Sequence, residues 1–321
     1  MTAPPTPPQR SPELPPLARY RSAGTIEREL EPGERHLAHA VSIVIPAFNE
    51  GAHVAAQVGD VARIMDASGW DYEIIVVDDG SADDTAQRAA EAGAHVLSHP
   101  RNRGYGASLK HGIRRAYFDW ILITDADGTY PVAAIPELLA RADVNDMVVG
   151  ARTGETVQIP LVRRPAKAFL RWLASYLSGQ HIPDINSGLR LMRKSLVERY
   201  EYLLPPGFSF TTTITLASIC NDHTVEYISI DYYKRLGNST IRARHAYDFT
   251  LLILRTIVFF NPLKVFIPLG AALAVIGIAK LIYDIFRDNM SETTVLGLLA
   301  ALIIWSVGML ADQNARMANR K

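Results

Sequence analysis

The sequence is poor in cysteine and has no excess of charge of either sign. Cys220 is the single cysteine among 321 residues, which excludes an internal disulfide framework and favours a reducing compartment. The 33 basic and 33 acidic side chains balance, so no overall field attracts nucleic acid, and we expect no nucleic-acid partner. Any basic site must therefore be local.

The N-terminal segment lacks the basic-then-apolar pattern of a signal peptide. Residues 1–40 instead contain eight of the 19 prolines and no sustained apolar periodicity. A segment of this composition buries too little apolar surface to offset its conformational entropy. We therefore expect a flexible arm, to which the sequence assigns no function.

Residues 41–240 show β-branched apolar runs that alternate with helical patterns. Strands are expected at 41–46, 72–77, 95–98, from 121 onward, and at 146–149. This alternation predicts an α/β domain with a mainly parallel, Rossmann-like sheet and helices on both faces. Ligands of such sheets bind beyond the carboxyl ends of the strands.

Polar clusters follow three of the expected strands. They are Asn49 with Glu50, Asp78 with Asp79, and Asp125 with Asp127. Three such clusters at one edge of a sheet are the pattern of a nucleotide site. Three ordinary strand-ending turns are the alternative.

The third cluster has the chemistry of a metal site. The apolar run from Ile121 ends at Asp125 and Asp127, which would project on the same side of a continuing strand because side chains alternate. Two carboxylates suit Mg²⁺ or Mn²⁺, which would bridge a diphosphate and neutralise charge on a leaving group. A turn rich in Asp and Gly would explain the same residues without a metal.

Local basic residues gather between residues 152 and 244. They are Arg163, Arg164, Lys167 and Arg171 in a helical pattern, and Lys234, Arg235, Arg242 and Arg244 near a strand end. Between the two groups, the polar run from Asp184 to Arg190 is a poor core sequence and a plausible phosphate or acceptor contact. A solvated basic face is the alternative for the first group.

The apolar residues concentrate toward the C-terminus. Residues 241–263 begin with basic residues and continue with an apolar run too short to span a bilayer, which predicts an amphipathic helix in the membrane interface. Residues 264–312 contain two runs long enough to span, with buried core helices as the alternative. Basic residues flank this pair, including the tail 313–321, so the positive-inside rule places both termini and the α/β domain in the cytoplasm.

Five motifs in order resemble those of the family 2 glycosyltransferases of GT-A fold. They are IPAFNE at 45–50, VDDGS at 77–81, NRGYG at 102–106, TDADG at 124–128 and DINSGLR at 184–190. The resemblance covers residues 41–236. Two spans after an interfacial helix are similar to the bacterial polyprenyl-phosphate glucosyltransferases, and less so to dolichol-phosphate mannose synthases.

The resemblance implies roles for matching positions. A nucleotide sugar would be bound by Pro46, Ala47, Asn49, Glu50, Asp78, Asp79, Gly104, Asp125, Ala126, Asp127, Arg152, Lys234 and Arg235. Asp125 and Asp127 would hold Mg²⁺ or Mn²⁺. The acceptor phosphate would be bound by Arg163, Arg164, Lys167 and Ser187, and the catalytic residues would be Asp127, Asp184 and Arg190, the last also facing that phosphate.

The resemblance also implies a reaction. A hexose from UDP-glucose or GDP-mannose would pass with inversion to a polyprenyl monophosphate at the cytoplasmic face of the inner or plasma membrane, giving a lipid-linked donor for cell-envelope or protein glycosylation. A phosphate monoester with a second pKa of about 6 is already anionic, so no strong base is required. Asp184 would orient the acceptor or stabilise an oxocarbenium-like centre. The bacterial relatives imply a homotetramer.

Other interpretations remain open. Processive polysaccharide synthases carry Gln-x-x-Arg-Trp after the acceptor motif, whereas here Ala168 replaces Gln and Arg171-Trp172 precedes Asp184. A dinucleotide oxidoreductase is disfavoured because Gly112 is wrongly spaced for the third glycine of its fingerprint. A non-catalytic membrane scaffold that binds a nucleotide sugar is a further alternative.

Overall fold

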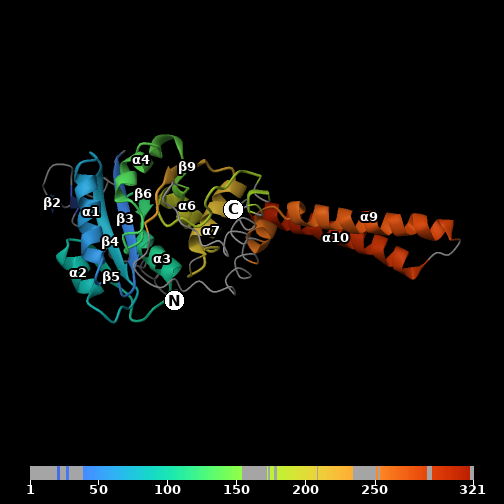
Figure 1. Ribbon diagram of the computed structural model, residues 1–321, viewed down its shortest axis with the longest axis horizontal. Helices are drawn as coiled ribbons and strands as arrows, with labels where there is room; N and C mark the ends of the chain where they lie inside the picture. Colours follow the sequence, from blue (N-terminus) through green and yellow to red (C-terminus); the bar gives the residue numbers. More distant parts are fainter. Residues whose placement is uncertain are drawn as a thin grey trace, which may run out of the picture.

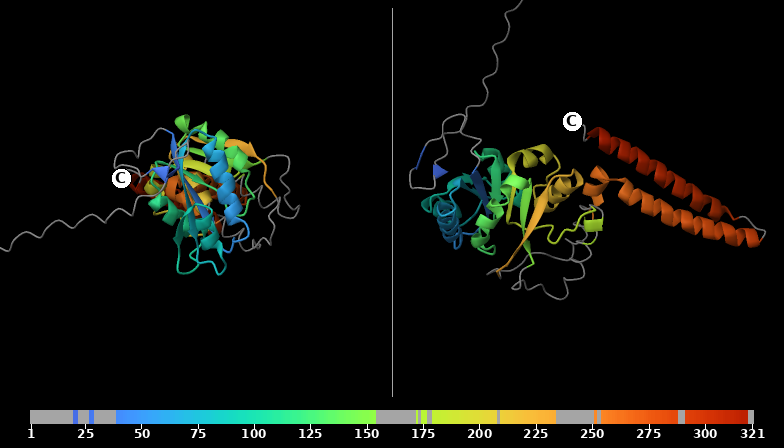
Figure 2. Two further views of the ribbon diagram at one scale, coloured as in Figure 1. Left: turned by 90° about the vertical axis from the view of Figure 1, so that its left-hand side faces the viewer. Right: turned by 90° about the horizontal axis from the view of Figure 1, so that it is seen from above.

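The computed structural model describes residues 20–21, 27–28, 39–153, 172, 174–176, 179–207, 209–233, 251, 254–287 and 291–318. These residues form a sheet-based domain and a long helical hairpin that extends away from it (Figure 1). The right-hand view of Figure 2 shows the same separation from above.

The sheet of the described residues contains nine strands. They are β1 Tyr20–Arg21, β2 Glu27–Arg28, β3 Ala40–Ala47, β4 Asp71–Asp78, β5 His95–Ser98, β6 Trp120–Ile123, β7 Met147–Arg152, β8 Arg190–Arg193 and β9 Val225–Ile230. Their order is β2-β1-β4-β3-β6-β8-β7-β9, and β5 pairs with β4. β8 is antiparallel to both β6 and β7, while β3, β4, β5 and β6 are parallel. The predicted α/β class with a mainly parallel sheet is confirmed.

Six helices flank the sheet in the described part of this domain. They are α1 Val54–Asp66, α2 Thr85–Glu91, α3 Tyr105–Arg115, α4 Ile135–Leu139, α6 Lys194–Tyr200 and α7 Phe210–Cys220. Between β6 and β7, α4 is short and lies between a 3₁₀ turn at Val132–Ala134 and a second 3₁₀ turn at Ala142–Val144. Neither β8 nor α6 was expected from the apolar pattern, because β8 is only four residues long and has arginine at both ends.

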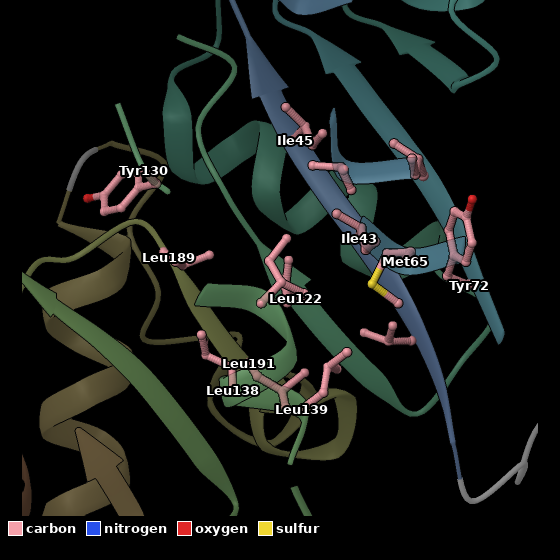
Figure 3. Packing of buried hydrophobic residues seen from close by; sticks show 14 of the residues in the cluster. Ile43, Ile45, Met65, Tyr72, Leu122, Tyr130, Leu138, Leu139, Leu189 and Leu191 are labelled. Atoms are coloured by element: carbon pink, nitrogen blue, oxygen red, sulfur yellow. The ribbon is translucent and has the colours of Figure 1, made fainter. Parts of the chain in front are cut away.

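The core lies on both faces of the sheet. Every residue of β3 is buried, because its alternate side chains enter two different layers. Ile43 and Ile45 pack with residues of α1 and α4 on one face (Figure 3). Val44 packs with residues of α3 and α7 on the other face. A strand with two apolar faces therefore becomes the rigid centre of the domain.

The hairpin consists of α9 Leu263–Phe286 and α10 Glu292–Ala318. Their most apolar windows have mean hydropathies of 2.3 and 2.2, and little of either window is buried. At 1.5 Å per residue, α9 is about 36 Å long, which exceeds the hydrocarbon core of a bilayer. The two helices of transmembrane length are thus present, although α10 continues through residues 313–318, which were expected to form a separate tail.

Glycine residues let the two hairpin helices approach closely. A Cβ atom added at Gly270 would lie 2.3 Å from Trp305 Nε1, and one at Gly308 would lie 2.6 Å from Phe266 Cβ. At the far end of the hairpin, Asp284 accepts hydrogen bonds from the Ser291 amide at 3.0 Å and from Lys280 Nζ at 2.6 Å. This carboxylate therefore ties the end of α9 to the start of α10.

About half of the expected interfacial helix at 241–263 falls outside the described residues. Residues 254–260 are helical, and Ile257 packs with Ala174, Ile182 and the first turn of α9 at Val265. The base of the hairpin is therefore continuous with the core of the sheet domain.

Close packing of α3 on the sheet makes a testable prediction at Gly112. A Cβ atom there would lie 2.5 Å from Val44 Cγ1 and 3.0 Å from Val77 Cγ2. Gly112→Val should therefore destabilise the domain by about 1–3 kcal/mol through overpacking. Thermal unfolding in detergent measures the effect.

A glycine with open surroundings supplies the control for that substitution. Gly59 is exposed in α1, and a Cβ atom added there would meet no other atom within 4 Å. Gly59→Ala should raise stability by about 0.5–1 kcal/mol, because it lowers the entropy of the unfolded chain without a clash. Equal destabilisation by both substitutions would contradict the packing argument.

Candidate active site

The carboxyl ends of β3 and β4 bring the first two polar clusters together. Ala47 and Asp78 are paired across the two parallel strands. The Asn49 amide donates to Ser81 Oγ at 2.9 Å, and Asn49 Oδ1 accepts from the Ala82 amide at 2.9 Å. Asn49 lies in the left-handed region with φ of 55°, which these bonds stabilise.

Asp78 and Asp79, at the end of β4, are buried and are not exposed as free ligands would be. Asp78 Oδ1 accepts from the Ser81 amide at 3.1 Å. Asp79 is buried and accepts from the Arg103 amide at 2.9 Å, the Gly104 amide at 2.8 Å and His99 Nδ1 at 2.7 Å. Asp79 therefore positions the loop that leads to Gly104, and its expected contact with a nucleotide sugar stays a prediction.

Asp125 and Asp127 lie in the turn after β6. The expectation that they project along a continuing strand is wrong, because β6 ends at Ile123. Asp127 Oδ1 accepts from the Thr129 amide at 3.1 Å and from Thr129 Oγ1 at 2.7 Å. Asp125 Oδ1 accepts from the Tyr105 hydroxyl at 3.1 Å. Both aspartates remain partly exposed, so the turn presents carboxylate oxygens at the edge of the sheet.

The 184–190 motif packs directly against this turn through Gly188. A Cβ atom on Gly188 would lie 2.9 and 3.0 Å from the two carboxylate oxygens of Asp125. The Gly188 amide donates to the Tyr130 hydroxyl at 2.6 Å. Only glycine leaves room for the carboxylate at this distance. The structure thus joins two motifs that are far apart in the sequence.

Two tyrosines at this contact were missed as site residues. Tyr105 and Tyr130 lie inside or next to the quoted motifs NRGYG and TDADG, which was the only signal for them. Burial, followed by the charge of Asp125, raises the pKa of Tyr105 well above its usual value. Burial likewise raises the pKa of Tyr130.

Arg152 and Asp184 form a mostly buried ion pair. Arg152 Nε donates to Asp184 Oδ2 at 2.6 Å and Nη2 donates to Oδ1 at 2.9 Å, which is a bidentate geometry. Nη2 also donates to Asn186 Oδ1 at 2.7 Å, and the guanidinium lies 5.3 Å from the ring centre of Tyr232. Burial would raise the pKa of Asp184, but the hydrogen bonds and charge of Arg152 outweigh it and lower that pKa.

Arg190 and Ser187 lie inside the fold. Arg190 has no exposed surface, and its guanidinium donates to the Ser187 carbonyl at 2.6 Å, the Thr211 carbonyl at 3.1 Å and Thr215 Oγ1 at 2.9 Å. Ser187 Oγ donates to the Gly150 carbonyl at 2.5 Å. Neither side chain reaches the surface, and their expected contact with an acceptor phosphate stays a prediction. They hold the 184–190 segment in place.

The remaining predicted residues divide into two groups. The first group is described: the Glu50 amide donates to Thr85 Oγ1 at 2.9 Å, and Pro46 and Ala47 end β3. Ala126 is buried between the two aspartates, and Gly104 precedes α3 with φ of 99°. Arg163, Arg164, Lys167, Lys234 and Arg235 lie outside the described residues, and their roles stay predictions.

The donor set at the β6 turn fits a divalent ion shared with a substrate. No group of three or more His, Cys, Asp or Glu side chains in the described chain is arranged to hold a metal by itself. Mg²⁺ is usually bound by one or two carboxylates together with substrate phosphates and water. Asp125 and Asp127 supply two hard oxygen ligands of that kind.

Comparison with known proteins identifies two segments. Residues 42–201 match the family described as Glycosyl transferase family 2, and residues 261–317 match the GtrB C-terminal hairpin. The chain is 32% identical over 166 residues to an undecaprenyl-phosphate 4-deoxy-4-formamido-L-arabinose transferase from Enterobacter sp. (strain 638). That match covers 50% of each chain, so the chain spans half the length of this relative.

Solved structures share the fold of the sheet domain. A glucosyl-3-phosphoglycerate synthase from Mycobacterium tuberculosis, crystallised with Mn²⁺, uridine diphosphate and phosphoglyceric acid, is 20% identical with a TM-score of 0.57, over 68% of this chain and 78% of that one. The same enzyme with Mg²⁺ and uridine diphosphate has 21% identity and a TM-score of 0.53, over 68% and 79%. The expected GT-A fold is confirmed, and the chain belongs to the family 2 glycosyltransferases, with a GtrB C-terminal hairpin after its catalytic domain.

Proposed function

We propose that this chain transfers a sugar from a nucleotide sugar to a polyprenyl monophosphate at a membrane surface. The observation that carries the proposal is the continuity of the glycosyltransferase domain with a hairpin of transmembrane length. Val265, in the first turn of α9, packs on the cluster that contains Ile182 and Ile185, and Ile185 is part of the 184–190 motif. The relative named for undecaprenyl phosphate supports the same acceptor class. A lipid acceptor would then approach the site from the bilayer.

The donor would bind at the carboxyl edge of the sheet. Pro46, Ala47, Glu50 and Asp78 would surround the nucleoside. Mg²⁺ or Mn²⁺ held by Asp125 and Asp127 would neutralise charge on the departing nucleoside diphosphate. The solved neighbours with bound uridine diphosphate and either metal support this assignment.

The acceptor oxygen would attack the sugar on the face opposite the leaving group, which inverts the anomeric centre. A phosphate monoester is already anionic at neutral pH and needs no strong general base. The lowered pKa of Asp184 makes it a poor base but keeps it negatively charged. We therefore assign Asp184 to orienting the acceptor or stabilising positive charge on the sugar, with Arg152 holding its carboxylate in place.

The sugar, the orientation and the assembly are also proposals. UDP-glucose and GDP-mannose are the donors expected from the sequence, and the name of the relative adds a 4-deoxy-4-formamido-L-arabinose donor. The basic flanks of the hairpin support a cytoplasmic catalytic domain with both termini on the same side. A homotetramer and a role in cell-envelope or protein glycosylation rest on the family resemblance alone.

Transfer to lipid tests the proposal directly. Detergent-purified protein, undecaprenyl phosphate and Mn²⁺ or Mg²⁺ are incubated with each labelled donor, and label is followed into the organic phase. We expect transfer that requires both lipid and metal, and that stops with EDTA. Label that stays aqueous with every donor, while nucleotide still binds, would favour a polysaccharide synthase or a non-catalytic scaffold.

Removal of one proposed metal ligand should abolish transfer without unfolding the protein. In Asp127→Asn the remaining amide oxygen can still accept from Thr129, so the turn is kept, but the negative charge toward the metal is lost. We expect at least about a 100-fold loss of transfer, the scale of losing one electrostatic contact to a developing charge. Asp143→Asn, at an exposed 3₁₀ turn, is the matched control and should keep full activity. Full activity of Asp127→Asn would remove the metal assignment.

The Arg152–Asp184 pair should leave a pH signature in stability. Arg152→Met leaves the Asp184 carboxylate mostly buried and unpaired, which should cost about 3 kcal/mol at pH 7. The lowered pKa means that the wild-type pair stabilises the fold above about pH 4 and loses this effect as the pH falls further. The difference between wild type and variant should therefore shrink toward pH 4, where Asp184 in the variant becomes protonated.

Thermal unfolding between pH 4 and pH 7 measures this difference. Arg141→Met is the control, because Arg141 pairs with Glu137 and Glu226 on a more exposed surface. Its cost should stay below about 1 kcal/mol. A difference for Arg152→Met that does not change with pH would show that Asp184 is not the group left unpaired.

A further inference from the structure

The first turn of α3 is fixed in position from several sides. A Cβ atom on Gly104 would lie 2.7 Å from the Pro206 carbonyl oxygen, and one on Gly106 would lie 2.3 Å from the Pro205 carbonyl oxygen. The Gly104 amide also donates to the buried Asp79 carboxylate at 2.8 Å. The first residue of α3, a tyrosine, therefore starts from a backbone with little freedom to move.

The side chain of Tyr105 crosses from α3 to the turn after β6. Its hydroxyl donates to Asp125 Oδ1 at 3.1 Å. On another side of the same carboxylate, Gly188 leaves no space for a Cβ atom. Asp125 is thus confined between a hydrogen-bond donor on a fixed helix and a close backbone on the 184–190 segment.

We propose that Tyr105 is a positioning residue for Asp125, which sets the direction of this carboxylate toward a divalent cation bound with the nucleoside diphosphate. The assignment rests on the proposed function, in which Asp125 is a metal ligand. Tyr105 would act on the ion only through its hydrogen bond to Asp125. It acts by selecting one orientation of Asp125 before the substrate arrives.

The physical argument concerns the rotational freedom of a carboxylate in a turn. Asp125 lies outside regular structure, so the backbone ladder of β6 does not fix its side chain. An ionised carboxylate offers about four acceptor sites on its two oxygens, so one carboxylate can accept a hydrogen bond and also bind a metal. Hydrogen-bond partners of metal ligands commonly change metal affinity by about 10–100-fold when they are removed. The Tyr105 hydroxyl is placed as such a partner.

The test compares two tyrosines that each donate to an aspartate. Tyr105→Phe removes only the hydroxyl that reaches Asp125. Tyr72→Phe is the matched control, because the buried Tyr72 hydroxyl donates to Asp66 Oδ1 at 2.6 Å, away from the polar edge, where β4 begins. The full-length protein in detergent is titrated with Mn²⁺ in the presence of uridine diphosphate, and free Mn²⁺ is followed by electron paramagnetic resonance. The unfolding temperature of each variant is measured alongside.

We expect Tyr105→Phe to weaken Mn²⁺ binding by about 10-fold or more, while Tyr72→Phe leaves it unchanged. In the transfer assay, Tyr105→Phe should need proportionally more Mn²⁺ for half-maximal rate and should recover much of its rate at saturating metal. A loss of Mn²⁺ affinity smaller than about 3-fold, or one matched by Tyr72→Phe, would overturn the assignment. Wild-type protein that binds no Mn²⁺ with uridine diphosphate would instead overturn the metal assignment of the proposed function, and the role of Tyr105 with it.

Discussion

The close approach of Gly188 to the Asp125 carboxylate is the contact on which the site depends. It joins the turn after β6 to the segment that leads into β8, and it requires a residue without a side chain. The antiparallel pairing of β8 with β6 brings the two segments together, since Ile123 and Arg190 are partners in the register. Replacing this one glycine by a larger residue would displace the carboxylate, although the substitution would change no charged side chain of the site.

Buried polar groups hold the rest of the site in place. Asp79 accepts hydrogen bonds from the loop before α3, and Arg190 donates to carbonyl groups of the 184–190 segment and α7. Arg152 holds Asp184 through an ion pair. Buried charges are costly unless hydrogen bonds compensate them. Each of these side chains is compensated by several partners, so together they make a rigid frame around the partly exposed carboxylates of the β6 turn.

The hairpin adds a constraint of a different kind. It exposes many large apolar side chains along α9 and α10, and its two helices meet through glycines and through the hydrogen bonds of Asp284. Its base shares a core cluster with residues next to the 184–190 motif. Insertion of the hairpin in a bilayer would therefore hold this part of the domain near the membrane surface, as the proposed lipid acceptor requires.

The sequence by itself determined the α/β class, the polar edge of the sheet, the two helices of transmembrane length and the family, because each depends on local apolar periodicity or on motifs of adjacent residues. It did not determine which polar residues face a substrate. Arg190, Asp79 and Ser187 have the residue types of ligands but are engaged inside the fold, and Tyr105 has no ligand signature but reaches Asp125. Only the tertiary structure decided these contacts, because burial and hydrogen-bond partners depend on segments far apart in the chain.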